Sequence, residues 1–469
     1  MNAEDSGTAE NPVVWSAFEG EKPRLIGGPR ISGWKMWKNN IWMCDLTSQN
    51  ITEISDLYVN GERQVLARYP NLDPSDPVGG GWSYVAGDPV PMYEKRASDS
   101  KTSFQTEPGD WRHWARPQEA RVFVFPRFNW WNNILNVKDV DPAGRLITTS
   151  HEASYALRPG DRYYFEGPIE ELDAPREWAY DKGEKRLYFM PDQPLSNADV
   201  FVPTTRSVIS LRQGVHHVIL QNLSIECATG SAVRFEQTAH CRLLDCRIRN
   251  IGDYSSTAVV VQEGADNGIS HCEISDVGGS GIALSGGDIK TLTPSSHFVE
   301  SCDIHNVGVR YKQGVGIALS GVGQRVSRCL LHHMPRFAIL FGGNNQTIEY
   351  NHIHDVVLET EDAGAVYSGS RDWINARGSV IRYNYIHDIP GFGFDGRKWR
   401  SSYKAWGIYL DDNAGGVDVT GNIVAKCGEA LLHGHSARDC YIENNIFVNG
   451  GKYQWEFNGW TASSEMWNK

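Results

Sequence analysis

The sequence lacks several features that would assign it directly to a class of function. No run of 18 apolar residues occurs among its 469 residues, so we expect no membrane partner. A formal net charge of −12 argues against a general grip on nucleic-acid phosphates, so we expect no nucleic-acid partner. The nine cysteines contain no C-x-x-C pair, and Walker, Rossmann and Gly-x-Ser-x-Gly motifs are absent in their required contexts. We therefore predict no bound metal and no cofactor.

The chain also lacks a recognisable leader and polar end caps. Residues 1–20 show no charged start followed by an apolar stretch, which a signal peptide needs. Both ends read like the middle of a strand layer, whereas repeat proteins need polar caps. We expect a longer natural protein that is periplasmic or extracellular.

What is present is a repeat in the C-terminal half. Its pattern is an aliphatic residue, two residues, Cys or Asn, one residue, and another aliphatic residue. Neighbouring copies are 22 to 38 residues apart, which is typical of one structural unit stacked on itself with insertions looped out. The central residues of the copies are Cys246, Cys272, Cys302, Cys329, Asn351, Asn384, Asn422 and Asn445.

The repeat predicts short strands rather than helices. Each copy has alternating runs rich in Val and Ile between Gly, Asn and Asp, and no amphipathic run is long enough for a helix. About 22 residues allow three short strands and three bends, one coil of a solenoid. We predict an all-β protein, a right-handed parallel β-helix, with stacked ladders of like residues inside.

Residues 36–200 interrupt the repeat. Strand-like runs and an Asn60-Gly61 hairpin signal predict an inserted antiparallel β-sandwich or barrel-like domain near the N-terminus. We expect residues 1–35 to form the first coil or coils and residues 201–469 to form the repeats that carry the active site.

Two ladders allow a functional and a structural interpretation. The four stacked cysteines favour a buried ladder of small thiols over disulfides or a metal cluster. Four histidines, His305, His332, His354 and His387, follow the inward aliphatic residue of successive coils, so they predict an outward row. Such a row could bind a transition metal, but it is a poor tetrahedral cage, and repeat duplication explains it better.

The candidate chemistry lies where the repeat spacing grows to 33 and then 38 residues, between Asn351 and Asn422. Acids, arginines and tryptophans concentrate there. By alternation, Tyr409, Asp411, His433 and Ser368 should face solvent, with Asp411 beside His433. Asp362 is offset along its strand by six residues, about 20 Å if straight. Either the chain bends at Ala363-Gly364, or Asp372 replaces Asp362 as the partner of Asp411.

Several motifs in this region resemble one family. Asp362-Ala-Gly-Ala-Val-Tyr-Ser-Gly, Arg371-Asp-Trp, Arg377-Gly-Ser-Val-Ile-Arg-Tyr-Asn and Tyr409-Leu-Asp-Asp, with the early Leu57-Tyr-Val-Asn-Gly-Glu-Arg, resemble glycoside hydrolase family 141. The β-helical xylosidases of family 120 are a more distant likeness. The resemblance implies a fucosidase-, xylanase- or xylosidase-like enzyme that uses two aspartates on neighbouring coils, Asp362 and one of Asp411 or Asp412.

The resemblance also implies how a glycan would be held. Trp373, Trp399, Trp406 and Tyr409 would stack on sugar rings, although the tryptophans could instead anchor a loop. Arg371, Asp372, Arg377 and His433 would form hydrogen bonds or ion pairs with the substrate.

Three functions fit these residues. A glycoside hydrolase acting on plant or microbial polysaccharide or oligosaccharide is favoured by the aspartates. A polysaccharide lyase on a uronate-containing glycan is an alternative, because the segment 392–406 is basic. A non-catalytic glycan-binding β-helix is the third, and it would have no close pair of acids.

Overall fold

A computed structural model describes residues 1–49, 51–369, 371–396 and 398–459. The chain forms two compact units. The β-helix unit comprises Met1–Gly27, Thr205–Gly393 and Ser401–Lys469, and the inserted unit comprises Gly28–Thr204 and Phe394–Arg400. Residues 28–35, expected in the first coil, belong to the inserted unit, because the backbone N–H of Ile31 donates to the carbonyl of Val200 at 2.7 Å.

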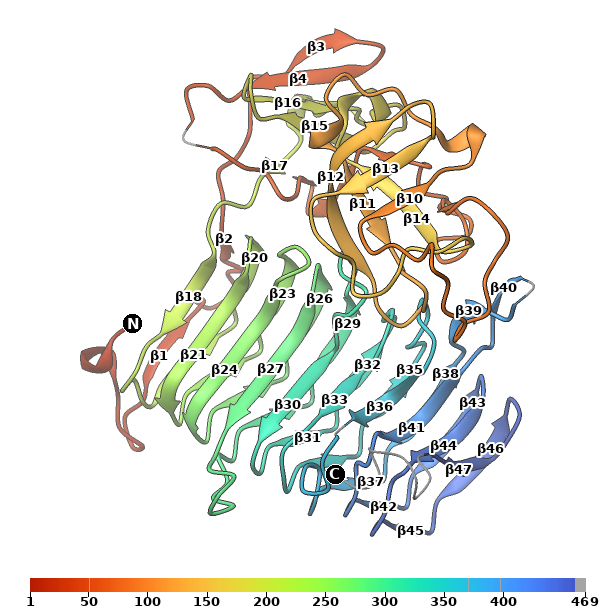
Figure 1. The fold of residues 1–469 in the computed structure, drawn as a ribbon. Coiled ribbons are helices and arrows are strands. Elements are labelled where there is room, and N and C mark those ends of the chain that lie inside the picture. Colours follow the sequence, from red (N-terminus) through yellow and green to blue (C-terminus); the bar gives the residue numbers. More distant parts are fainter. Residues whose placement is uncertain (50, 370, 397, 460–469) are drawn as a thin grey trace. The chain divides into compact units, whose positions relative to one another are not determined.

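Three ten-stranded parallel sheets run the length of the β-helix unit, and Figure 1 shows their stacked strands from β18 to β47. Sheet 1 contains β1 (Val13–Ser16), β19 (Val218–Gln221), β22 (Arg242–Leu244), β25 (Gly268–Ser270), β28 (Phe298–Glu300), β31 (Arg325–Ser327), β34 (Thr347–Glu349), β37 (Val380–Arg382), β42 (Asp418–Thr420) and β45 (Tyr441–Glu443). Sheet 2 contains β2 (Arg24–Ile26), β20 (Ser224–Ala228), β23 (Arg247–Ile251), β26 (Glu273–Val277), β29 (Asp303–Val307), β32 (Leu330–His332), β35 (His352–His354), β38 (Tyr385–Ile389), β43 (Ile423–Cys427) and β46 (Ile446–Gly450). Sheet 3 contains β18 (Ser207–Leu211), β21 (Ser231–Ala239), β24 (Thr257–Ala265), β27 (Ser280–Gly286), β30 (Ile317–Gly321), β33 (Ile339–Phe341), β36 (Ala363–Gly369), β41 (Ala405–Asp411), β44 (Ala430–His435) and β47 (Trp455–Asn458).

The inserted unit is built mainly from antiparallel sheets. Its seven-stranded sheet contains β10 (Ser103–Gln105), β13 (Leu146–Thr149), β12 (Asn133–Asp141), β11 (Arg121–Val124), β14 (Arg162–Glu166), β8 (Arg68–Tyr69) and β9 (Ser83–Tyr84). Its five-stranded sheet contains β3 (Lys35–Lys38), β4 (Ile41–Asp45), β16 (Arg186–Phe189), β15 (Glu177–Asp181) and β7 (Val65–Leu66). A three-stranded sheet contains β17 (Val200–Phe201), β5 (Tyr58–Val59) and β6 (Glu62–Arg63), of which β5 and β6 form the predicted hairpin at Asn60-Gly61.

The remaining elements are short. A two-stranded ribbon joins β39 (Phe392–Phe394) to β40 (Trp399–Ser401). Five 3₁₀ turns cover Ala3–Asp5, Pro108–Asp110, Pro117–Glu119, Ile169–Glu171 and Leu195–Asn197. Within the described parts of the chain, no helix has the length and apolar character needed to span a bilayer.

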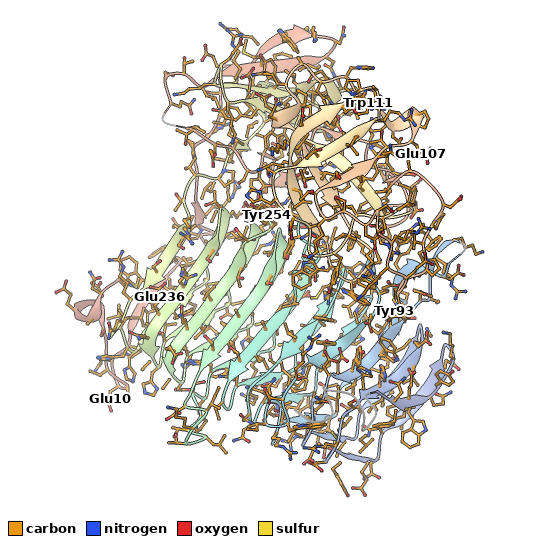
Figure 2. The ribbon with its side chains drawn as sticks, in the orientation of Figure 1. Glu10, Tyr93, Glu107, Trp111, Glu236 and Tyr254 are labelled. Carbon is orange, nitrogen blue, oxygen red and sulfur yellow. The ribbon has the colours of Figure 1, made fainter. Side chains whose placement is uncertain are left out.

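Alternation divides each sheet into an inner and an outer face. On β21, Phe235 is fully buried, while its neighbour Glu236, labelled in Figure 2, lies on the outer face and accepts a hydrogen bond from Arg234 at 2.8 Å. Stacked aliphatic residues from all three sheets fill the inside, so the unit has one continuous core and its side chains for chemistry must lie outside.

The predicted central ladder is present. All four cysteines of the repeat are buried free thiols. Where the ladder changes to asparagine, the backbone N–H of Cys329 donates to Oδ1 of Asn351 at 3.0 Å. The same bond recurs from Asn351 to Asn384 at 3.0 Å, and from Asn384 to Asn422 at 3.0 Å. Each asparagine side chain therefore bonds the coil beside it, which fixes the register of neighbouring coils.

The turn after the ladder strand also follows the prediction. The leading residues of six copies all adopt a positive φ between 49° and 60°, the left-handed geometry that Asn and Asp tolerate best. These residues are Asn250, Asp276, Asn306, Asp355, Asp388 and Asn449.

We predict that Asn384→Ala strongly destabilises the β-helix unit. The side chain of Asn384 accepts from Asn351 and donates to the carbonyl of Ile348 at 3.0 Å and to Asn422 at 2.9 Å. Removing it leaves at least two buried groups unpaired, which costs roughly 2–5 kcal/mol. Thermal unfolding followed by circular dichroism measures the loss. The exposed Lys290→Ala is the control, and equal midpoints for the two variants would contradict the prediction.

Candidate active site

Sheet 3 carries the candidate site on its outer face. The register pairs Gly369 of β36 with Asp411 of β41, and Tyr367 with Tyr409. On the next strand, Tyr409 pairs with His433 and Leu410 with Gly434, so His435 follows as the neighbour of Asp411. The outward serine of the earlier coils, Ser320 on β30, has thus become an aspartate here.

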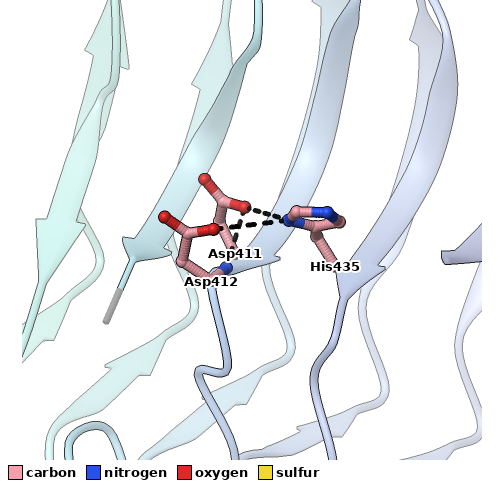
Figure 3. A group of neighbouring side chains, drawn as sticks. All are labelled: Asp411, Asp412 and His435. Carbon is pink, nitrogen blue, oxygen red and sulfur yellow. Dashed lines mark hydrogen bonds and ion pairs between the residues drawn. The ribbon is translucent and has the colours of Figure 1, made fainter. Parts of the chain in front are cut away.

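Asp411 accepts hydrogen bonds from three donors. Its Oδ2 accepts from the hydroxyl of Tyr367 at 2.7 Å. Its Oδ1 is bonded to Nδ1 of His435 at 2.9 Å and accepts from the backbone N–H of Asp412 at 2.8 Å. Figure 3 shows His435 reaching from β44 toward the two carboxylates at the end of β41. This arrangement holds the Asp411 carboxylate in one orientation.

His435 is the positive centre of the site. Hydrogen bonds to Asp411 and Asp412 raise the pKa of His435 to about 9. The second of these contacts joins Nδ1 to Oδ1 of Asp412 at 3.6 Å. At neutral pH the ring is therefore an imidazolium shared by two acids.

Asp412 has a different set of partners. Burial raises its pKa, but the hydrogen bonds from His435 and Arg371 outweigh burial and lower the pKa below its usual value. Nε of Arg371 lies 3.0 Å from Oδ2 of Asp412. Asp412 is thus an ionised partner of two cations, which suits it to holding the site together more than to transferring protons.

Asp362 reaches the same region from the start of β36. Tyr409 pairs with Tyr367, which is five residues after Asp362. A straight strand would therefore place the backbone of Asp362 roughly 16 Å from Tyr367 and its neighbour Tyr409. Instead, the hydroxyl of Tyr409 donates to Oδ1 of Asp362 at 3.2 Å. The chain therefore bends beside Gly364, where a Cβ atom would lie only 2.7 Å from Cβ of Tyr409. The bend was the first of the two predicted alternatives.

The environment of Asp362 favours its neutral form. Burial, with a further contribution from the negative charge of Asp411, raises its pKa to about 6. The charge of Lys404 and the hydrogen bond from Tyr409 oppose this rise. The carboxyl groups of Asp362 and Asp411 therefore interact electrostatically, and their hydrogen-bond partners differ.

Two tyrosines connect the acids. The rings of Tyr367 and Tyr409 meet edge to face with their centroids 5.2 Å apart, and Phe337 stacks on Tyr367 at 4.2 Å. Burial and the nearby aspartates raise the pKa of both phenols, so both hydroxyls keep their protons and act as donors. The hydroxyl of Tyr409 also interacts with Asp411, so one phenol faces both carboxyl groups.

Three expectations about exposure and pairing were wrong. Ser368 is fully buried and pairs with Leu410, because Val366 rather than Tyr367 occupies the inward position. His433 lies beside Tyr409, not beside Asp411, because Leu432 is the inward residue of β44. Tyr409 and His433 do lie on the outer face, but only 3% and 4% of their surfaces are exposed.

Trp406 closes an aromatic cluster over these residues. Its ring is 4.6 Å from both Tyr409 and His433, its Nε1 donates to Glu456 at 3.2 Å, and it is 4% exposed. Trp399 lies in the inserted unit, 6.1 Å from the ring of Tyr84, with the guanidinium of Arg162 5.1 Å from its centroid. Both tryptophans are thus packed against protein groups.

The segment after β36 is held by its own polar side chains. Oδ1 of Asp372 accepts from the backbone N–H groups of Ile374 and Asn375 at 2.9 and 2.7 Å. Arg377 donates to the carbonyl of Trp373 at 2.6 Å and forms an ion pair with Asp439. The guanidinium of Arg438 lies 3.4 Å from the centroid of Trp373. Of the predicted substrate-binding residues in this segment, Arg371 contacts the aspartates, through Asp412.

Sequence reasoning missed His435 and Tyr367. His435 lies two residues after His433, and alternation places both on the outer face, so the correct register would have found it. Within the described residues, Asp411, Asp412 and His435 are also the only three side chains of metal-ligating type whose ligand atoms all lie within 4.8 Å of one another. Arg371 and the charge of His435 already neutralise these carboxylates.

Comparisons with known proteins agree on the architecture. Residues 231–464 match the family model described as "Right handed beta helix region". The chain is a right-handed parallel β-helix. A solved structure described as "Glycoside hydrolase" aligns with a TM-score of 0.69 at 17% identity, over 95% of this chain and 86% of that chain.

Other likenesses are weaker. The complex of XylC with xylose aligns at 12% identity with a TM-score of 0.34, over 95% of this chain and 67% of that chain. A mannuronic-acid-specific family 6 polysaccharide lyase from human gut microbiota aligns at 12% identity with a TM-score of 0.31, over 55% of this chain and 73% of that chain. A comparison with curated protein sequences gives no match. The likeness to the glycoside hydrolase structure, at 17% identity, shows a shared fold alone.

The raised pKa of His435 predicts a loss of stability with rising pH. Its pKa moves from an ordinary 6.5 in the unfolded chain to about 9 in the folded chain. The stabilisation is complete below pH 6.5 and disappears as pH rises through about 9. The difference in thermal midpoint between the wild type and His435→Gln should therefore shrink across this window. A difference that stays constant with pH would contradict the charge assigned to His435.

Proposed function

We propose that this β-helix is a glycoside hydrolase acting on a polysaccharide or oligosaccharide, with Asp362 and Asp411 as its catalytic pair. The observation that carries the proposal is a pair of interacting carboxyl groups whose environments differ, reached by one phenol. When two carboxyl groups lie in different environments, one can act as proton donor and the other as proton acceptor. The resemblance to family 141 and the shared fold with a glycoside hydrolase structure add support.

Asp362 is the proposed general acid. A group with a pKa of about 6 holds its proton in mildly acidic solution and can pass it to the leaving glycosidic oxygen. The hydrogen bond from Tyr409 directs one carboxyl oxygen and leaves the other oxygen for the sugar.

Asp411 is the proposed nucleophile, or the base that activates water. Its three donors fix its position and leave it as an acceptor. His435 and Arg371 balance the charges of Asp411 and Asp412, so the two adjacent acids can stay close together beside a positively charged, oxocarbenium-like transition state. A carboxyl separation of about 5–5.5 Å would give retention and about 6.5–9.5 Å inversion.

We expect Asp362→Asn and Asp411→Asn each to lower kcat/KM about 10²- to 10⁴-fold. In the wild type, kcat/KM should fall about tenfold per pH unit above pH 6, as Asp362 loses its proton. This limb should be missing from Asp362→Asn. Asp288→Asn is the matched control, because this exposed turn residue lies outside the proposed site and its amide oxygen can still accept from the backbone N–H of Lys290. Full activity in both catalytic variants would reject the assignment.

A polysaccharide lyase is the second candidate, since the charges of Lys404 and Arg336 both act on Asp362 and could neutralise a uronate. Product analysis separates the two functions. Hydrolysis adds water and leaves two saturated sugars, whereas elimination leaves an unsaturated sugar that absorbs in the ultraviolet. We expect saturated products only, at a rate that a chelator does not change. Unsaturated products, or loss of activity with chelator, would favour the lyase.

The proposal also covers the class of glycan that the enzyme acts on and the place where it acts. The proposed substrate is a polymeric glycan, and the enzyme would meet it in the periplasm or outside the cell. A purified panel of fucose-, xylose- and uronate-containing glycans tests the substrate class directly.

A further inference from the structure

The histidine row of sheet 2 is independent of the site on sheet 3. The predicted row is present: His305 stacks on His332 with centroids 4.8 Å apart, and His332 on His354 and His354 on His387, each at 5.2 Å. Two nitrogens bound to one metal at 2.0–2.1 Å are at most about 4.2 Å apart. Parallel rings whose centroids are 4.8 to 5.2 Å apart therefore do not bind one metal ion together.

His352 breaks this geometry. It lies on the outer face of β35, two residues before His354, and pairs with Tyr385 of β38. Its ring is tilted by 36° to that of His387, and the two Nε2 atoms are 2.8 Å apart. A diagonal contact between neighbouring strands thus brings two imidazole nitrogens together on a rigid sheet, at a partly solvent-exposed position.

Asp388 orients one of these rings. Nδ1 of His387 lies 2.6 Å from Oδ2 of Asp388, and Nζ of Lys426 lies 3.3 Å from the other carboxylate oxygen. Nδ1 of His387 therefore carries the proton, and its Nε2 presents a lone pair. A carboxylate behind a histidine in this way is typical of metal ligands.

The 2.8 Å contact is a hydrogen bond between the two imidazoles, and the same separation can be compared with that of two nitrogens bound to one metal ion. Two nitrogens about 2.0 Å from a metal are about 2.8 Å apart at a right angle and about 3.3 Å apart at the tetrahedral angle. Neighbouring positions of a square plane fit, and the tetrahedral arrangement preferred by Zn²⁺ does not.

We propose that His352 and His387 form a binding site for a square-planar transition-metal ion, with Cu²⁺ preferred over Ni²⁺ and Zn²⁺. The ion replaces the proton held between the two Nε2 atoms, and this proton passes to water. Each ring turns about its Cβ–Cγ bond so that its lone pair points at the ion while the two nitrogens stay near their present separation, and water fills the remaining positions. The preference for Cu²⁺ follows from the geometry and from the general affinity order of divalent metals.

Titration of the untagged full chain with CuCl₂ tests the proposal. Calorimetry should show one tight equivalent, and electron paramagnetic resonance should show an axial Cu²⁺ signal split by two nitrogens. His352→Gln and His387→Gln should each weaken binding of this equivalent at least tenfold, and Asp388→Asn should weaken it severalfold. Thermal unfolding of each variant establishes that it is folded.

His332→Gln is the matched control. This variant removes one ring of a second close pair of histidines, in which Nδ1 of His332 lies 2.6 Å from Nδ1 of His333. The other ring nitrogen of His332, Nε2, contacts Asp303 at 3.2 Å. Unchanged Cu²⁺ affinity in this variant supports the assigned site. Equal weakening in His332→Gln and His352→Gln, tighter binding of Zn²⁺ than of Cu²⁺, or the absence of a tight equivalent would each overturn the proposal.

Discussion

The structure depends on the residue-by-residue register between neighbouring coils. Parallel backbone hydrogen bonds hold strands of successive coils side by side, but they would tolerate a slip along the strand. The inner ladders prevent a slip, since each coil must place its aliphatic residues in the core and its asparagine against the next asparagine. Asn351, Asn384 and Asn422 bind both the backbone and the side chain of a neighbour. A shift by one residue would bury the outward side chains and break every one of these bonds.

This rigid register is what makes a site possible on an outer face. The register places each outward residue beside its counterpart on the next coil. A substitution at one such position therefore puts a new side chain next to known neighbours on both sides. On sheet 3, the outward serine of β30 is replaced by Asp411 on β41, and His435 occupies the matching position on β44. Beside them, the phenols of Tyr367 and Tyr409 join Asp411 to Asp362. The same device on sheet 2 produces the contact of His352 with His387.

The scaffold was predictable from the sequence because repeats sum a weak signal over many coils. The strand type, the buried cysteines, the left-handed turn residues such as Asp276 and Asp388, and the row of histidines were all confirmed. The site was less predictable because it lies where the repeat departs from its template. A shift of one residue in aligning Val366 moved Ser368 to the wrong face, and a shift at Leu432 gave Asp411 the wrong histidine. The bend that brings Asp362 to Tyr409 depends on a close approach at Gly364, which spacing alone does not reveal.

The central claim is that Asp362 and Asp411 form one interacting pair in which Asp362 holds the proton. Carbon-13 NMR of selectively labelled aspartate side chains measures this directly, by following the carboxyl carbon of Asp362 with pH in the wild type and in Asp411→Asn. The account predicts that Asp362 titrates near pH 6 in the wild type and at a lower pH in the variant, because the neighbouring negative charge is gone. Titration of Asp362 near the ordinary aspartate value, unchanged by the substitution, would contradict it.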